Sequence, residues 1–143
     1  MKWDLRFLEL AKLVSTWSKD PSTKTGAVLI RPDRTVAAVG FNGFPRCMSD
    51  DPALYADRDK KYSRIVHAEV NALIHARESV FGFTLYIWPF ACCDRCVVQM
   101  LQAGISRFVF PVPTEDALSR WSEAFVRTKE YIIEAGATWL EVQ

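Results

Sequence analysis

The sequence has no excess of charge of either sign, because 18 lysines and arginines stand against 17 aspartates and glutamates. A nearly neutral chain has no general electrostatic attraction to DNA, RNA or an anionic membrane. The sequence also has no apolar run that approaches the roughly 18 residues needed to cross a bilayer. These absences argue against a nucleic-acid polymer and against a membrane as partners.

The N-terminus lacks the apolar core of a secretory signal. Residues 1–6 instead place Asp4 beside Lys2 and Arg6, and charge at this position is not typical of a signal sequence. We therefore expect a cytoplasmic protein.

Cysteine is scarce, with four residues in the chain, and three of them lie within five positions: Cys92, Cys93 and Cys96. This spacing is typical of a metal or redox site and not of a disulfide framework. Cys47 is isolated in the sequence, and we expect it to be a buried or partly buried thiol.

The length of 143 residues fits one domain with a core of its own. Apolar periodicity predicts a helix over about the first seventeen residues, ended by Asp20-Pro21, and a hairpin of strands 26–30 and 35–41. Helices are expected at 67–77, 93–103 and 115–135, and strands at 83–88, 105–110 and 138–142. Strands that alternate with helices after a hairpin indicate an α/β fold, with a mixed sheet covered by helices on both faces.

The segment 42–66 shows no periodic pattern and is rich in turn residues. We interpret it as a loop, and a loop this long within a compact domain is usually functional or mobile. It includes the charged run 57–61, whose side chains we expect to lie on a solvated surface.

Two short motifs carry candidate chemistry. His67 and Glu69 are separated by one residue, and Cys93 and Cys96 by two. Three ligands, His67, Cys93 and Cys96, would leave a tetrahedral zinc ion with an open position, which is the arrangement of a catalytic site. Cys92 could replace Cys93 at a helical i, i+4 spacing, but the C-x-x-C turn is the commoner metal clip. The other interpretation, core cysteines beside a core histidine, would not account for the combination with Glu69.

In this layout both motifs start helices, whose partial positive charge favours thiolates. Helix N-termini of this kind converge at one edge of an α/β sheet. Zinc would lower the pKa of a bound water towards about 7 and provide hydroxide near neutral pH. Glu69 would then accept and return the protons of a hydrolytic deamination.

The two motifs match the H-x-E…P-C-x-x-C pattern of zinc-dependent nucleobase deaminases, with Cys92 in place of the proline. The resemblance extends to the deoxycytidylate deaminase family, within the cytidine deaminase-like zinc enzymes. The stretches that resemble its SKDP…VGAV, GYNGxP, SDD, HAExNA and AGI segments are residues 18–28, 40–46, 49–51, 67–72 and 103–105.

The resemblance implies a three-layer α/β/α cytidine deaminase-like fold with a five-stranded mixed sheet. It implies hydrolysis of dCMP to dUMP and ammonia for thymidylate synthesis, by a zinc-bound hydroxide with Glu69 as proton shuttle. It also implies a homo-oligomer, commonly a hexamer, that is activated by dCTP and inhibited by dTTP, with Mg²⁺ accompanying the effector. The residues that would contact substrate or effector are Lys24, Thr25, Asn42, Gly43, Arg46 and Ala68.

Two other functions fit the same motifs. The first is deamination of another cytosine or adenine substrate, such as dCTP, free cytidine or tRNA, although a tRNA enzyme would usually carry a basic face. The second is a zinc-stabilised nucleotide sensor without catalysis. The presence of Glu69 favours an enzyme.

Overall fold

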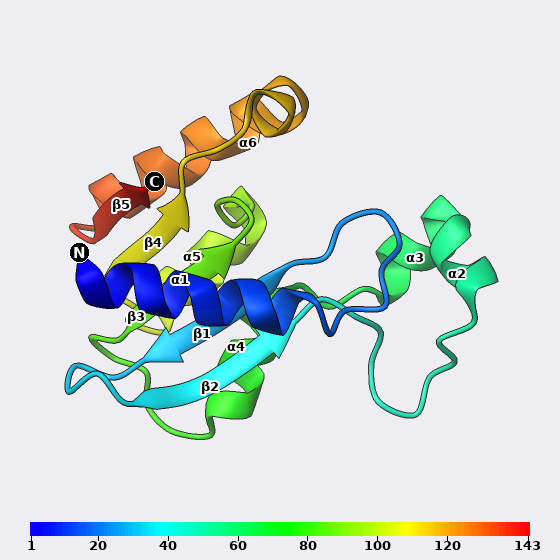
Figure 1. Cartoon of the computed structure of the whole chain (residues 1–143), viewed down its shortest axis with the longest axis horizontal. Helices are drawn as coiled ribbons and strands as arrows, with labels where there is room; N and C mark the ends of the chain where they lie inside the picture. Colours follow the sequence, from blue (N-terminus) through cyan, green and yellow to red (C-terminus); the bar gives the residue numbers. More distant parts are fainter.

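The computed structural model describes residues 1–143 and contains one five-stranded mixed sheet (Figure 1). The strands lie in the order β2-β1-β3-β4-β5. Strand β1 pairs antiparallel with both β2 and β3, whereas β3 with β4 and β4 with β5 are parallel. The bounds are β1 (Gly26–Ile30), β2 (Val36–Phe41), β3 (Thr84–Trp88), β4 (Arg107–Pro111) and β5 (Thr138–Val142). The predicted α/β class and mixed sheet are confirmed.

Helices cover both faces of this sheet. Helix α1 (Lys2–Ser15) lies across the front of the sheet in Figure 1 and packs on Val28 and Ile30 of β1. The alternate residues Ala27 and Leu29 face the other side, where they join the larger core. That core also contains residues of α4 (Ala68–Ala76), α5 (Asp94–Gln102) and α6 (Glu115–Glu134). The period-2 alternation of a strand therefore separates the two helical layers.

Two glycines let helices approach the sheet closely, one on each face. A Cβ atom at Gly26 would lie 2.1 Å from the carbonyl oxygen of Ala11 in α1. A Cβ atom at Gly40 would lie 2.4 Å from the carbonyl oxygen of Ala68 and from the amide nitrogen of Ala72, both in α4. Helix α4 therefore packs at a distance from β2 that a residue with a side chain would not allow.

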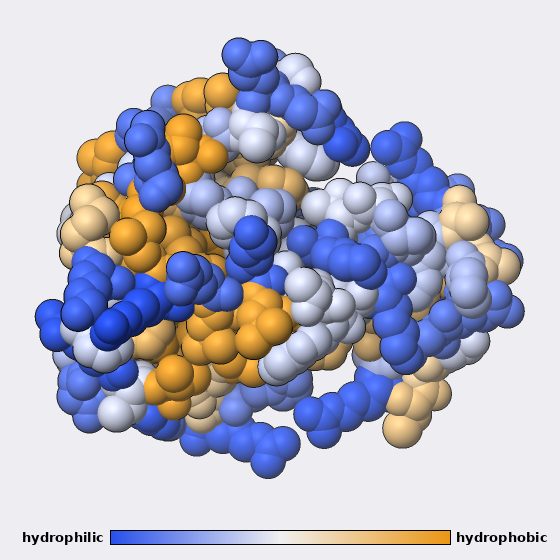
Figure 2. Space-filling model, in the orientation of Figure 1, coloured by the Kyte–Doolittle hydropathy of each residue, from blue (hydrophilic) through white to orange (hydrophobic).

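The interpretation of residues 42–66 as one loop is wrong, because this segment contains α2 (Pro52–Ala56) and α3 (Arg58–Arg64). Asp51 caps α2 by accepting a hydrogen bond from the amide of Ala53, and Asp57 caps α3 through the amide of Lys60. Helices this short contain too few apolar repeats to show a period. They lie beside the sheet in Figure 1, on a side where hydrophilic residues gather on the surface (Figure 2).

Two smaller expectations need correction. Helix α1 ends at Ser15, before Asp20-Pro21, because the chain turns at Thr16 with hydrogen bonds back to Leu13 and Val14. Cys47 is exposed, since it lies on a turn of the 42–66 segment and not against the core.

None of the helices combines the length and the apolarity that a membrane span requires.

Helix α6 is not regular throughout. Trp121 has φ −133° and ψ 20°, which kinks the helix near its first third. The helix is fixed to the body of the molecule by buried residues before and after the kink, namely Ala117, Phe125, Thr128 and Ile132.

Candidate functional site

The starts of helices α4 and α5 meet on one side of the sheet. His67 is the N-cap residue of α4, Cys93 is the N-cap residue of α5, and Glu69 and Cys96 lie in the first turns of these helices. One ligand atom from each of the four side chains lies within 4.8 Å of all the others. The packing of the two helices therefore brings together residues that are more than 20 positions apart in the sequence.

The distances within this group fit a tetrahedral metal ion. Nδ1 of His67 lies 3.1 Å from Sγ of Cys96 and 3.7 Å from Sγ of Cys93. Bonds of about 2.0 Å to nitrogen and 2.3 Å to sulfur would separate the ligand atoms of a tetrahedral zinc by about 3.5 Å. One imidazole and two thiols form a donor set that zinc prefers.

Glu69 is, with Cys96, one of the two buried members of this group. Its carboxylate lies 3.8 Å from Nδ1 of His67, and the residue is 4% exposed. Burial alone would raise the Glu69 pKa, but the hydrogen bond and the charge of His67 outweigh burial and lower this pKa. The carboxylate is thus in its basic form near neutral pH.

The thiol of Cys93 is also activated. A hydrogen bond from Cys96 and another from His67 outweigh burial and lower the Cys93 pKa to about 5. In turn, Cys93 and then Glu69 raise the pKa of His67 to about 10. One thiolate and one carboxylate in so small a volume create a site that attracts a cation.

Cys92 lies apart from the ligand group. It is buried in the main core, and burial raises the pKa of its thiol well above the ordinary value. Its carbonyl oxygen accepts a hydrogen bond from Oγ1 of Thr128 in α6. A protonated core thiol of this kind is a packing residue, and the geometry favours Cys93 over Cys92 as the partner of Cys96.

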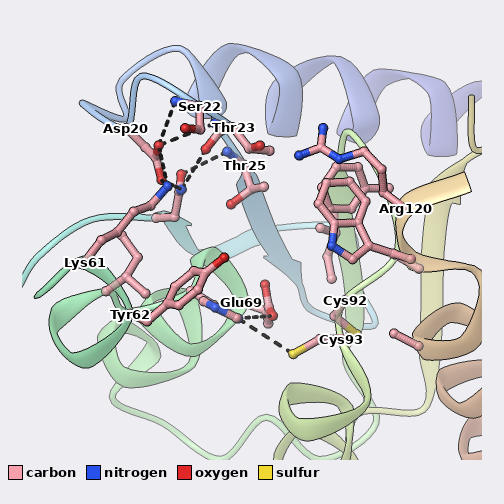
Figure 3. Close-up of a pocket in the computed structure, with 18 of the residues that line it drawn as sticks. Asp20, Ser22, Thr23, Thr25, Lys61, Tyr62, Glu69, Cys92, Cys93 and Arg120 are labelled. Carbon is pink, nitrogen blue, oxygen red and sulfur yellow. Dashed lines mark hydrogen bonds and ion pairs between the residues drawn. The ribbon is translucent and has the colours of Figure 1, made fainter. Parts of the chain in front are cut away.

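The group opens into a cavity of about 470 Å³, a volume typical of small-molecule sites. Figure 3 shows Glu69 and Cys93 at one end of this cavity, with Lys61 and Tyr62 of α3 on one side and Arg120 of α6 across from them. Apolar residues line much of the remaining wall: Ile65, Ile87, Phe90, Ala91, Trp121, Ala124 and Phe125.

A buried polar network joins α3 to the segment before β1. Nζ of Lys61 lies 2.9 Å from the carboxylate of Asp20, and these side chains are 14% and 3% exposed. Asp20 also accepts hydrogen bonds from the amide of Ser22 and from Nδ2 of Asn42. The expectation that the whole charged run 57–61 is solvated is therefore wrong for Lys61, which has a buried partner.

Asn42 and Thr25 both line the cavity. The Asn42 side chain is occupied by the protein itself, because Oδ1 accepts from the amide of Thr25 and Nδ2 donates to Thr23 and Asp20. At 7% exposed, it braces the wall of the cavity. Thr25 is the predicted contact whose side chain has no such bond.

Four of the residues expected to contact a nucleotide do not line the cavity. Lys24 donates to the carbonyl oxygen of Ser18, and Arg46 lies 3.1 Å from Nε2 of His75 on the exposed surface. Gly43 forms a backbone bridge with Val66, and Ala68 is fully buried. The structure therefore places the side chains of these four residues outside the lining of the cavity, although Ala68 stands between His67 and Glu69 in the chain.

The sequence interpretation did not identify the residues that form the cavity walls. Arg58, Lys61, Arg120 and Trp121 come from α3 and from α6, and Arg120 lies more than 20 residues after the cysteine motif. Phe90, which follows the end of β3, also lines the cavity. No local pattern marks these residues, because their place depends on how α3 and α6 pack against the sheet.

Comparison with known proteins gives a consistent result. A family model described as the cytidine and deoxycytidylate deaminase zinc-binding region matches residues 1–112. An uncharacterised deaminase in the luxG 3′ region of Aliivibrio fischeri is 42% identical over 97% of this chain and 94% of its own length. Deoxycytidylate deaminase of Mus musculus is 32% identical over 77% of this chain and 65% of its own length. The chain thus spans about two thirds of the mouse enzyme.

Solved structures agree on the fold. The apo form of a dCMP deaminase from the cyanophage S-TIM5 superposes with a TM-score of 0.75 at 20% identity, over 99% of this chain and 98% of the other. The complex of that phage enzyme with dCMP and dUMP gives a TM-score of 0.70 at 20% identity, over 97% and 96% of the two chains. The three-layer fold expected from the sequence is confirmed.

Proposed function

The chain belongs to the cytidine and deoxycytidylate deaminase zinc-binding family, and we propose that it hydrolyses dCMP to dUMP and ammonia. The observation that carries this proposal is the group of His67, Glu69, Cys93 and Cys96 at one end of a cavity. The choice of dCMP is supported by the name of the mouse relative and by the phage structure that holds dCMP and dUMP.

In this proposal, His67, Cys93 and Cys96 hold one zinc ion, and Glu69 stays free of it. Zinc supplies a Lewis acid that lowers the pKa of a water molecule to about 7. The starts of α4 and α5 both point at the site, and their partial positive charge favours the thiolate form of the cysteines.

Glu69 acts as the proton shuttle. Its buried carboxylate is ionised at neutral pH, as its lowered pKa indicates, and it lies within reach of the ligand group. It accepts a proton from the attacking water and delivers it to the ring nitrogen beside the attacked carbon. It then accepts a second proton, from the hydroxyl group now bound to the attacked carbon, and delivers this proton to the leaving amino group, so that ammonia departs and the carboxylate is regenerated.

The walls of the cavity suit a pyrimidine ring. Ile87 lies within β3, and Phe90 follows the C-terminal end of this strand. Both residues line the cavity beside the ligand group. The Phe90 ring packs against Trp121 with 4.8 Å between ring centroids. Apolar and aromatic walls of this kind exclude water from the reacting atoms and contact the flat face of a base.

The test is to incubate the zinc-loaded protein with dCMP and to measure ammonia release together with the fall in ultraviolet absorbance. Glu69→Gln should keep its zinc and lose at least about 100-fold in kcat. Glu78→Gln is the matched control, because Glu78 pairs with Arg31 away from the cavity. Deoxycytidine, cytidine, dCTP and a tRNA anticodon stem serve as competing substrates. Nucleotide binding without turnover of any of them would refute the proposal.

Regulation and assembly remain predictions from the family resemblance. We expect a homo-oligomer, commonly a hexamer, whose activity rises with dCTP and falls with dTTP in the presence of Mg²⁺. We also expect the dUMP that it forms to supply thymidylate synthesis. Sizing by light scattering, and dCMP turnover with each effector added, test these expectations. A monomeric protein whose dCMP turnover is the same with and without dCTP or dTTP would contradict these expectations.

A further inference from the structure

We propose that Arg120 of α6 is the residue that binds the 5′-phosphate of the substrate, and that it makes this enzyme select nucleotides over nucleosides. The inference deepens the proposed function and rests on it for the identity of the reacting base. It assigns the recognition of phosphate to a helix that begins after residue 112, where the match to the family model ends.

The charges that line the cavity leave two cations without a buried partner. Lys61 is neutralised by Asp20 at 2.9 Å, and Glu69 and His67 belong to the ligand group. The remaining charged side chains of the lining are Arg58 and Arg120. A phosphate monoester carries about −1.5 to −2 charges at pH 7, so two guanidinium groups without a buried partner complement it. A nucleoside has no phosphate that could pair with these two guanidinium groups.

Arg120 is available for such a ligand. Its only ion pair is with Asp116, at 3.5 Å, and both side chains are more than half exposed. Figure 3 shows the side chain of Arg120 across the cavity from Lys61, with Glu69 at the end between them. A base held at Glu69 would leave its sugar and phosphate in the part of the cavity between Lys61 and Arg120, and Lys61 is already paired with Asp20. A guanidinium group can bind two phosphate oxygens at once.

Helix α6 holds Arg120 more firmly than α3 holds Arg58. The guanidinium carbon of Arg120 lies 4.4 Å from the centre of the Trp121 ring, which in turn packs on Phe90. The kink at Trp121 occurs beside the cavity, directly after Arg120. By contrast, α3 has seven residues and none of them is buried. Binding energy is greatest where the contacting group is already ordered, and this favours Arg120 as the main phosphate ligand.

A second contact fixes α6 relative to the ligand group. Nε of Arg127 lies 2.8 Å from the carboxylate of Asp94, one of the two residues between the candidate zinc cysteines. The hydrogen bond from Thr128 to the Cys92 carbonyl is a further link between the same segments. Arg120 is therefore held in a fixed relation to the position where the base reacts.

The experiment compares Arg120→Gln, Arg58→Gln and Arg6→Gln with the unchanged protein, all loaded with zinc. Arg6 is the matched control, because it also lies over a tryptophan ring but is on α1, on the opposite face of the sheet. Two readouts are measured: kcat/KM for dCMP and for deoxycytidine, and the equilibrium Kd of dUMP and of deoxyuridine by calorimetry. Thermal melting checks that each variant is folded, which we expect for a side chain as exposed as Arg120.

We expect Arg120→Gln to lower kcat/KM for dCMP and the affinity for dUMP by about 10- to 100-fold, since a hydrogen-bonded charge is lost. Values for deoxycytidine and deoxyuridine should stay within about twofold, and Arg6→Gln should change neither. An equal loss with and without phosphate would overturn the assignment, and so would a loss confined to Arg58→Gln. Absence of any deamination by the unchanged protein would refute the proposed function alone, because dUMP binding would still test Arg120.

Discussion

Replacing Gly40 by alanine should damage the site from a distance, by moving the helix that carries His67 and Glu69. Gly40 lies on β2 under α4, and an added Cβ would be 2.4 Å from the Ala68 carbonyl oxygen and from the Ala72 amide nitrogen. Both are backbone atoms, so no side chain can turn aside to make room. The helix itself must shift.

The size of the shift follows from these distances. Ordinary van der Waals contact begins at 3.4 Å, so α4 must move by about 1 Å. Overpacking of this kind costs about 1–3 kcal/mol of folding free energy. A misplacement of about 1 Å in a catalytic group can cost about 100-fold in rate. We therefore expect a stable but poorly active protein, whose zinc also dissociates faster because His67 has moved away from Cys93.

The assay combines urea unfolding, kcat/KM for dCMP and the rate of zinc loss to a chelator. Gly26→Ala is the matched control, because its Cβ would lie 2.1 Å from the Ala11 carbonyl oxygen but would displace α1, which carries no residue of the ligand group. We expect the two variants to lose similar stability, whereas only Gly40→Ala should lose activity and zinc. Equal losses of activity in the two variants, or unchanged stability of Gly40→Ala, would refute this reasoning.

Two further predictions concern the ligand group and the α1 layer. Cys93→Ala should lose bound zinc, measured by elemental analysis, whereas Cys92→Ala should keep one ion per chain; the reverse result would contradict the geometry. Asp4 accepts hydrogen bonds from Arg107 and Tyr86, and the bond from Arg107 is the main reason that its pKa falls from 3.8 to about 2. This contribution of about 2 kcal/mol is complete above pH 4 and disappears as the pH falls towards 2. In urea unfolding, the difference in stability between the unchanged protein and Asp4→Asn should therefore shrink between pH 7 and pH 2. A difference that stays constant over this range would contradict the role of the ionised Asp4 carboxylate.

Much of the fold could be predicted from the sequence because its elements are periodic. The continuous apolar run of β1 and the apolar stripe of α4 are local patterns; the first indicates a strand buried on both faces, and the second a helix that buries one face. Helices α2 and α3 are too short for a period, and their two capping aspartates were the available signal. Asp51 is equally typical of a turn, and Asp57 belongs to the charged run that we expected to be solvated, so neither residue by itself indicates a helix.

The sequence by itself determined the chemistry that this protein can hold: one imidazole, one carboxylate and two thiols at spacings that place each pair at the start of a helix. These spacings are local, so they survive without knowledge of the rest of the chain. Only the tertiary structure decided which residues surround that chemistry. In the folded chain, internal hydrogen bonds occupy the side-chain amide of Asn42, and Lys61 pairs with Asp20. Arg120 reaches the cavity from a helix that is distant in the sequence. Such contacts depend on how the layers of helices pack on the sheet, and this packing cannot be predicted from any single stretch of the sequence.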